Sequence, residues 1–536
     1  MAQGDGERAW YGRTTPAGPW DCVVIGSGVG GMTAAALLSK LGRRVLVLEQ
    51  HRVPGGMTHT FRRKGYVFDT GVHVVGQATT AALPGRMLDD LTDGGLQWAS
   101  LGPVYDRLTF GDDFELALPN RPKAYREALC ALFPRERSAI DRYLEQLRDA
   151  SDSMGRLFLA RLLPASTGRP VEALLARKAR RYCAQTTAEA LVRLTRDERL
   201  RAAWTGQWGY LGLPPARSAF AAHATVASHY SYGGYYPVGG SERIAEQLLG
   251  AVARQGGYTR VAASVERILL ERGRAAGVEL ESGERIRARH VLSAVGVVAT
   301  VERLVPDAVR GQRWAREVAR LRSGPAHVCL YLGLKGDVEA AGASRANHWF
   351  HRGTTWTERV WPLGAPDDVG TPTSLYCSFG SLKDPAHDPG PEQRHTAELL
   401  TFVPWESFAR WQDRTWRRRG AEYDALKAAI QERLLELFAA RYPRLAPMID
   451  YVELSTPLST VNFCRSIDGA MYGLEHTPER FACPWLRPRS PIPGLLFAGN
   501  EVLTAGVMGA MMGGAFAALS LAPVAGAKWL GRLVFG

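Results

Sequence analysis

Residues 21–77 read DCVVIGSGVGGMTAAALLSKLGRRVLVLEQHRVPGGMTHTFRRKGYVFDTGVHVVGQ, and this stretch decides the fold. An apolar run, Cys22 to Ile25, leads into the glycine-rich turn 26–31 and then into a helical segment rich in alanine and leucine. A second apolar run, 45–48, ends at Glu49. Strand, glycine turn, helix, strand and acidic residue in this order are typical of a dinucleotide-binding βαβ unit, and an ordinary glycine turn would not show them all. The sequence therefore predicts an α/β fold that binds a dinucleotide.

Each part of this unit has a physical role. Glycine lets the backbone turn tightly and approach a pyrophosphate, whose charge sits at the N-terminus of the following helix. We expect Glu49 to accept hydrogen bonds from ribose hydroxyls. The glycines expected at the pyrophosphate are Gly26, Gly28, Gly30 and Gly31.

Two further segments indicate which dinucleotide is bound. Gly55 and Gly56, followed by Met57 and Thr58, let a loop pass close to a cofactor, as in flavoenzymes of the glutathione-reductase type. Residues 494–501, GLLFAGNE, predict a strand and a glycine turn before an apolar helix, and in such flavoproteins this turn meets the ribityl chain and the pyrophosphate. The sequence contains no second GxGxxG for a nicotinamide domain. We therefore expect FAD, held at this end by Gly499, Asn500, Glu501 and Val507.

The motifs resemble those of a known family. Residues 45–76 are similar to the VLVLEQH, GGxxHTF and FDTGxHYxG motifs of the retinol saturase branch of the carotenoid desaturase and isomerase flavoproteins. Later segments fit the same branch in the same order: GLPP at 212–215, YPVGG at 236–240 and GAMYG at 469–473. The resemblance covers nearly the whole chain. It implies a flavin-dependent oxidoreductase that saturates a C=C bond of an apolar conjugated polyene or isoprenoid lipid.

The sequence departs from the motifs of that branch by three exchanges, one of a single residue and two of residue pairs. Val74 stands where tyrosine is common, Met57 and Thr58 replace a cysteine pair, and Asn500 and Glu501 replace glutamine and aspartate. The last exchange keeps the chemistry. The first two are expected to line the pocket, so they leave the identity of the substrate open.

The resemblance also implies how the chain is divided. We expect a glutathione-reductase-type FAD-binding Rossmann lobe that is discontinuous and interleaved with an α+β substrate-binding lobe. The expected segments are 18–80, 238–300 and 485–525 for the FAD lobe, 81–237 and 301–484 for the substrate lobe, 1–17 for a flexible N-terminal arm and 526–536 for a tail. The backbone near Val265 is expected to meet the adenine end of the cofactor. Ser241 is predicted to cap the helix that begins the second FAD segment, and Asp69 to form a turn.

Composition limits the partners. The net charge of +13 comes mostly from dispersed arginines, with small clusters at 177–181 and 417–419. No nucleic-acid-binding module is recognisable, so we expect no nucleic-acid partner; the clusters are either solvated surface or a site of attraction to anionic lipid. The seven cysteines are widely spaced without CxxC, which indicates neither a disulfide framework nor a zinc site. We expect a cytoplasmic protein without a metal.

The C-terminal region contains a long uncharged stretch, which could belong to a transmembrane or to a buried helix. Residues 509–527 carry no charge over about a membrane-spanning length, but glycines and a proline interrupt them, so a buried last helix of the FAD lobe is predicted rather than a transmembrane helix. For the tail, two interpretations stay open. It either lies in a membrane interface, which would make the protein peripheral on the inner face of a membrane, or is soluble; its distinctive residues are Lys528, Trp529, Arg532 and Phe535.

Saturating a C=C bond needs a hydride on one carbon, which a flavin can give, and a proton on the other. The proton donor must lie within hydrogen-bond reach of the alkene or of a relay water. The five candidates, each of which could instead be a structural partner of the backbone, are His73, Tyr230, His59, His229 and Tyr472. The electron donor is unidentified: transiently bound NAD(P)H, a carrier protein or a quinol would each serve.

Three functions are compatible with these patterns. The first is the saturase. The second is a carotenoid desaturase or cis-trans isomerase that uses the same flavin. The third is a non-enzymatic binder similar to Rab escort and GDP-dissociation-inhibitor proteins, which the intact glycine turn, Glu49 and the C-terminal turn argue against.

Overall fold

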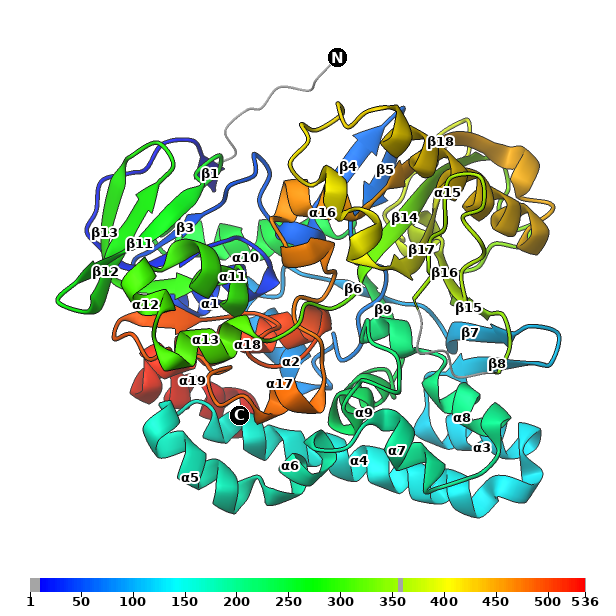
Figure 1. Ribbon diagram of the computed structural model, residues 1–536, viewed down its shortest axis with the longest axis horizontal. Helices are drawn as coiled ribbons and strands as arrows, with labels where there is room; N and C mark the ends of the chain where they lie inside the picture. Colours follow the sequence, from blue (N-terminus) through cyan, green and yellow to red (C-terminus); the bar gives the residue numbers. More distant parts are fainter. Residues whose placement is uncertain (1–9, 355–359, 536) are drawn as a thin grey trace.

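The computed structural model describes residues 10–354 and 360–535. Two β-sheets lie side by side in the upper half of Figure 1, and a layer of helices runs along the lower edge. Each sheet brings together segments that are far apart in the sequence.

The first sheet has eight strands and a parallel centre. β2 (Trp20–Ile25) pairs in parallel with β3 (Val45–Leu48) on one side and with β13 (Arg285–Ser293) on the other. The other strands are β10 (Tyr258–Arg260) and β1 (Tyr11–Gly12) beyond β3, β19 (Leu495–Phe497) beside β13, and the antiparallel β12 (Arg274–Leu280) and β11 (Val265–Glu271). All of β3 is buried, as a parallel strand covered on both faces requires.

Three helices pack close to β2. α1 (Val29–Lys40) follows β2 directly, and α10 (Glu242–Arg254) and α18 (Gly506–Leu521) pack against α1. The approach of α18 depends on glycine, because a Cβ on Gly514 would lie 2.0 Å from the carbonyl oxygen of Gly30. A Cβ on Gly30 would lie 2.5 Å from the Cα of Gly499. The first turn of α1 and the turn after β19 therefore meet.

The second sheet has seven strands. In spatial order they are β18 (Ile449–Ser455), β14 (Ala326–Lys335), β17 (Arg394–Val403), β16 (Ser374–Ser378), β15 (Asn347–His351), β7 (Val104–Phe110) and β8 (Phe114–Pro119). One part of its core packs with α15 (Ala421–Arg441). Another contains Trp349, Tyr376 and Leu400 together with α4 (Arg137–Ala160) and α9 (Phe220–His229).

Most predicted strands and helices are present, with small shifts at their ends. Residues 285–293 form one continuous strand, β13, which stays in register with β2 from Ala288 to Ser293. Of the expected arm 1–17, residues 1–9 lie outside the described residues, whereas Tyr11 and Gly12 form β1 and pair with β10.

The predictions that Ser241 caps α10 through its side chain and that Asp69 forms a turn are both wrong. Ser241 stands directly before α10 but makes no cap, because its hydroxyl donates to the carboxylate of Asp69. Asp69 is not a turn residue: it is buried at the end of β5 (Tyr66–Asp69) and also accepts a hydrogen bond from Tyr236. A buried carboxylate needs such donors, and the local sequence does not reveal them.

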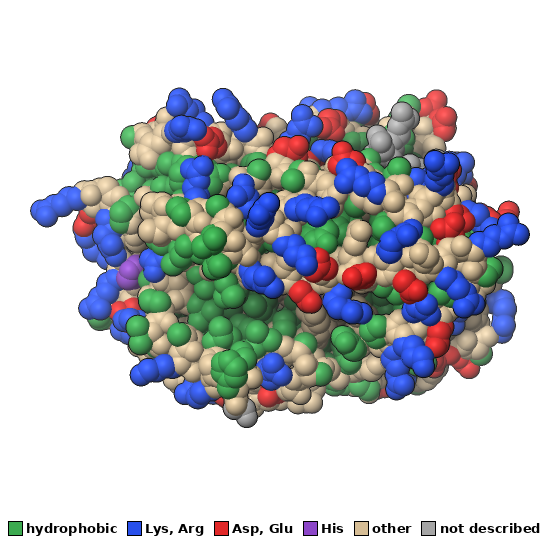
Figure 2. Space-filling view, turned by 90° about the horizontal axis from the view of Figure 1, so that it is seen from below, with side chains coloured by type: hydrophobic (Ala, Val, Ile, Leu, Met, Phe, Trp, Pro, Cys, Tyr) green, Lys and Arg blue, Asp and Glu red, His purple; other side chains and the backbone are tan. Residues whose placement is uncertain are grey.

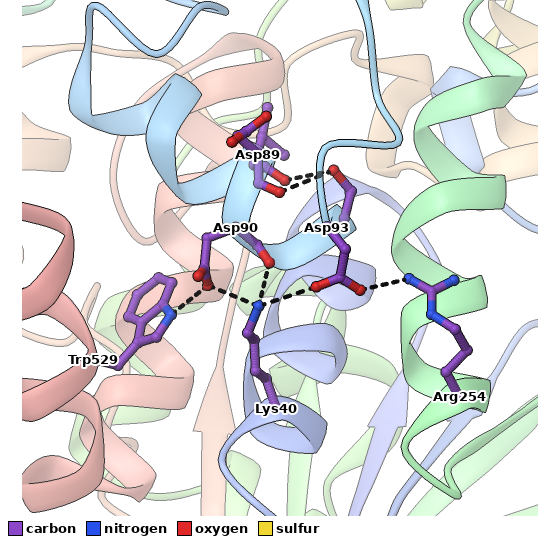
Figure 3. Close-up of polar contacts among 8 residues, drawn as sticks. Lys40, Asp89, Asp90, Asp93, Arg254 and Trp529 are labelled. Carbon is purple, nitrogen blue, oxygen red and sulfur yellow. Dashed lines mark hydrogen bonds and ion pairs between the residues drawn. The ribbon is translucent and has the colours of Figure 1, made fainter.

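The predicted tail is a packed helix, α19 (Pro523–Phe535). Trp529, for which both a membrane-interface position and a soluble one were open, is 1 % exposed, and its indole nitrogen donates to Asp90 of α2 (Leu83–Thr92) at 2.7 Å. Figure 3 shows how Lys40 pairs with both Asp90 and Asp93, at 3.1 and 3.4 Å. This cluster fixes the inner side of α19, while Val534 and Phe535 stay exposed. None of the helices described here has the length and apolar character needed to cross a bilayer.

Candidate functional site

Two cavities adjoin at the junction of the two sheets. The smaller, about 450 Å³, lies at the carboxyl ends of β2 and β3, where nucleotides bind in open α/β sheets. The larger, about 700 Å³, extends from the first turn of α18 to the second sheet. Gly28, Met57 and Asn500 line both cavities, so the two spaces meet at the glycine turn.

Glu49 lines the smaller cavity with its carboxylate held in place. One oxygen accepts hydrogen bonds from the backbone N–H of Ser27 (3.0 Å) and from its hydroxyl (2.6 Å). The other oxygen accepts the N–H of His51 at 2.8 Å. Ser27 also accepts the N–H of Gly55 at 2.9 Å, which ties the second glycine loop to the first. The sequence motifs did not predict a role for Ser27, although this residue stands between two glycines of the first turn.

The glycine turn leaves room for a ligand. A Cβ added to Gly28 would meet no atom within 4 Å, and the same holds for Gly499 and Gly506. α1 and α18 both begin here, and neither has an acidic side chain in its first turn to neutralise the positive end of the helix dipole. Open space at glycines beside two helix N-termini fits a pyrophosphate.

The other predicted cofactor residues lie around this point or support it. Val265 and Gly56 line the smaller cavity, as Gly26 does, while Thr58, Gly30 and Val507 line the larger one. Gly31 and Gly55 line neither cavity; Gly31 packs against the carbonyl oxygen of Gly26, which a Cβ would approach to 2.1 Å.

Hydrogen bonds to three other segments of the chain hold the C-terminal turn. Asn500 donates to the carbonyl of Tyr472 at 2.8 Å, and Arg480 donates to the carbonyl of Asn500 at 2.7 Å. Glu501 accepts the N–H of Val297 at 2.6 Å, and burial raises the pKa of its carboxyl. Asn500 and Glu501 both line the smaller cavity.

The larger cavity is mostly apolar and has two distinct ends. Its outer end is lined by Leu159 of α4 and Val534 of α19, both exposed, so the cavity opens to solvent between these helices. Its inner end is lined by Trp349, Tyr376 and Leu400 of the second sheet, all buried. Such a tunnel suits an elongated apolar ligand.

Four of the five candidate proton donors line the larger cavity: His73, His229, Tyr230 and Tyr472. Neither ring nitrogen of His73 has a hydrogen-bond partner among the described residues, and burial with nearby Lys383 lowers its pKa to about 3. The Nε2 atom of His229 accepts the N–H of Gly76 at 2.9 Å, which places the proton of the neutral ring on Nδ1. Burial lowers the pKa of His229 to about 4.

His59 lies elsewhere. It lines neither cavity, and its Nδ1 lies 2.6 Å from the carbonyl oxygen of Gly56. The structure therefore separates His59 from the other four candidates and gives it the backbone-supporting role that was the alternative for each of them.

The sequence did not reveal a polar cluster behind the inner end. Asp106 is fully buried and accepts hydrogen bonds from Gln207, Tyr210, Asn347 and Trp349 at 2.6 to 3.1 Å. Tyr210 and Trp349 line the cavity itself. Because these five residues come from three separate segments, no local pattern could have predicted their meeting.

Residues 29–520 match the family model described as flavin containing amine oxidoreductase. The chain belongs to this family. The match confirms the predicted flavin cofactor and a flavin-dependent oxidoreductase of the Rossmann type.

Comparison with individual relatives shows to which branch of these flavin oxidoreductases the chain is similar. The chain is 31% identical over 515 residues to all-trans-retinol 13,14-reductase from Homo sapiens, covering 92% of this chain and 84% of the relative, which confirms the resemblance to the retinol saturase branch. Prolycopene isomerase 1 from an Oncidium hybrid cultivar is 24% identical, covering 86% of this chain and 76% of the relative. Among solved structures, putrescine oxidase bound to putrescine shares the fold, with a TM-score of 0.62, 15% identity, and 95% and 100% of the two chains covered.

Proposed function

We propose that the protein is an FAD-dependent oxidoreductase that saturates a C=C bond of an apolar conjugated polyene. The observation that carries this proposal is the junction of the two cavities at Gly28, Met57 and Asn500, which would bring an apolar chain against the flavin end of a dinucleotide. The relatedness to retinol 13,14-reductases supports the reaction class.

The chain's own residues would hold FAD along this path. Glu49 and Val265 lie at the adenosine end, the N-termini of α1 and α18 flank the pyrophosphate position, and Thr58 and Val507 line the cavity beyond it. Apart from β1, which comes from the expected arm, the strands of the first sheet come from the three segments expected for a discontinuous FAD lobe. Those of the second sheet come from the two segments expected for the substrate lobe. We assign the lobes on that basis.

When bound and reduced, the flavin supplies the hydride. The apolar walls exclude water and orient the polyene along the tunnel, and the proton must come from a group on the cavity wall or from a water beside it. Burial keeps His73 and His229 neutral at pH 7, so neither is a stored acid there. The electron donor would be a soluble nicotinamide, a carrier protein or a quinol.

Mass spectrometry tests the reaction. A panel of conjugated polyenes is incubated anaerobically with the holoenzyme after photoreduction of its flavin. A product heavier by two hydrogens, matched by flavin reoxidation, is expected. Unchanged mass with a shifted retention time, while the flavin stays reduced, would establish the isomerase instead.

A membrane surface is the second part of the proposal. Figure 2 shows hydrophobic side chains gathered around a hollow on the face that carries α4 and α5 (Ala165–Leu175). Exposed apolar residues at the cavity mouth and on the neighbouring helices are Leu159, Leu163, Leu174, Leu175, Val524, Val534 and Phe535. The helices that carry most of these apolar residues also carry exposed basic residues, such as Arg156, Lys528 and Arg532, and exposed acidic residues, such as Asp152. An anionic bilayer complements both features and would deliver an insoluble substrate to the mouth.

Vesicle co-sedimentation tests this surface. The holoenzyme should bind vesicles of phosphatidylcholine with phosphatidylglycerol, and Leu174→Asp with Phe535→Asp should weaken binding at least 10-fold, because two exposed apolar anchors become charged. Val67→Asp, an exposed valine on β5, is the matched control. Equal binding by the double variant and the control would refute the membrane surface.

A further inference from the structure

The inner end of the larger cavity contains polar atoms without partners. Neither ring nitrogen of His73 makes a hydrogen bond to a described residue, and the buried hydroxyl of Tyr376, which lies near Tyr210 and Ser378, makes none of standard geometry. The rings of His73 and Tyr376 lie 5.7 Å apart, both residues line the cavity, and their exposed fractions are 9 % and 3 %. Buried polar side-chain groups in proteins are nearly always paired, so these three atoms point to a missing ligand.

Some of the polar groups around them are engaged. Asp106 has four donors, and the ammonium of Lys383 donates to the carbonyl of His73 at 2.9 Å, to Ser378 at 2.6 Å and to Asn347. Nδ1 of His327 and both carboxylate oxygens of Glu398 are buried without a partner among the described residues, but neither residue lines the cavity. His73 and Tyr376 line its inner end, so a ligand there can reach their polar atoms.

We propose that His73 and Tyr376 form a recognition site for one terminal oxygen of the substrate, a hydroxyl or a carbonyl, at the inner end of the cavity. The polyene chain then runs outward, past the flavin position, toward the mouth between α4 and α19. This inference rests on the proposed function, and it selects an oxygenated polyene over a hydrocarbon. It also gives His73 a binding role in place of proton donation.

The chemistry of the pair matches such an oxygen. A neutral imidazole has one donor and one acceptor nitrogen, and a phenol can donate and accept. Burial lowers the pKa of His73 to about 3, so the ring is neutral near pH 7. A hydroxyl can therefore accept from one residue and donate to the other, while a carbonyl accepts from both.

A hydrocarbon of the same length gains nothing from the pair. It displaces water from the inner end and leaves the buried donors and acceptors unpaired, which disfavours its binding. Sites built around a substrate hydroxyl reject analogues that lack it for this reason. We expect the wild-type protein to bind the alcohol at least 10-fold more tightly than the hydrocarbon.

Binding measurements on the holoenzyme with oxidised flavin test the proposal without turnover. A C20 all-trans polyene alcohol and its hydrocarbon counterpart with a terminal methyl group are titrated in detergent, with quenching of tryptophan fluorescence as the signal. Tyr376→Phe should weaken binding of the alcohol about 10-fold and should not weaken that of the hydrocarbon, because it removes a hydroxyl that the hydrocarbon leaves unpaired. His73→Leu should act likewise, whereas His73→Asn, which keeps a donor and an acceptor, should retain most of the preference.

Tyr66→Phe is the matched control, because Tyr66 is a buried tyrosine outside both cavities that donates to Asp450 at 3.0 Å. Equal affinities for alcohol and hydrocarbon in the wild type, or equal weakening of both ligands by Tyr376→Phe, would overturn the proposal. A changed flavin spectrum in His73→Leu with unchanged selectivity would also overturn it, by assigning His73 to the cofactor. Selective binding without C=C reduction would keep this inference and refute the proposed reaction.

Discussion

Gly28 and Gly30 stand two residues apart in one turn, yet they have different tasks. Gly28 has an ordinary φ of −63°, and a Cβ there would enter open space beside the helix N-termini. A Cβ on Gly30 would collide with the backbone of Gly499 at 2.5 Å. The first glycine keeps space for the ligand, and the second permits the packing of two chain segments.

Alanine substitutions separate these tasks. Gly28→Ala should lower the flavin content of the purified protein at least 10-fold, because the methyl group occupies the pyrophosphate position. The melting temperature of the flavin-free variant should equal that of flavin-free wild type. Gly30→Ala should lower the free energy of unfolding by about 1–3 kcal/mol through overpacking. Flavin absorbance and thermal denaturation measure the two effects. Normal flavin content in Gly28→Ala would refute the cofactor placement.

At the scale of elements, α19 forms one wall of the cavity mouth while its inner side is fixed by Trp529. Trp529→Ala should cost about 3–5 kcal/mol, as loss of a buried tryptophan does, and should release the helix. Asp90→Asn, which keeps an acceptor for the indole, should cost much less. Hydrogen exchange over residues 523–535 is the measurement, and unchanged protection in Trp529→Ala would contradict this account.

At the scale of the whole molecule, buried histidines make the fold sensitive to acid. Burial lowers the pKa of His73 to about 3 and those of His223, His327 and His351 to about 4, against an ordinary 6.5. Between these values the unfolded chain binds protons that the folded histidines exclude, so these histidines lower the free energy of unfolding as the pH drops from about 6.5 toward 4. For His223 alone the loss approaches about 3 kcal/mol. Buried carboxyls with a raised pKa, such as those of Glu398 and Asp106, act in the opposite direction.

Thermal denaturation across this range checks the sign. His223→Gln, which keeps a polar partner for Tyr143, should destabilise the protein less at pH 4.5 than at pH 6.5, each compared with wild type at the same pH. An equal difference in melting temperature at the two pH values would contradict the lowered pKa of His223.

The sequence alone determined the dinucleotide-binding unit and its cofactor class, because strand, glycine turn, helix and acidic residue are contiguous and each is required by local geometry. It also determined the family, through motifs spread along the chain. Tertiary structure alone decided which candidates share a cavity: His73, His229, Tyr230 and Tyr472 do, and His59 does not. It also decided that the hydroxyl of Ser241 donates a hydrogen bond to Asp69 and that Trp529 is buried. Only the tertiary structure shows the surroundings of Tyr376 and Asp106, because their neighbours come from distant segments. The pairing of buried polar groups depends on such long-range contacts, which local sequence patterns do not encode.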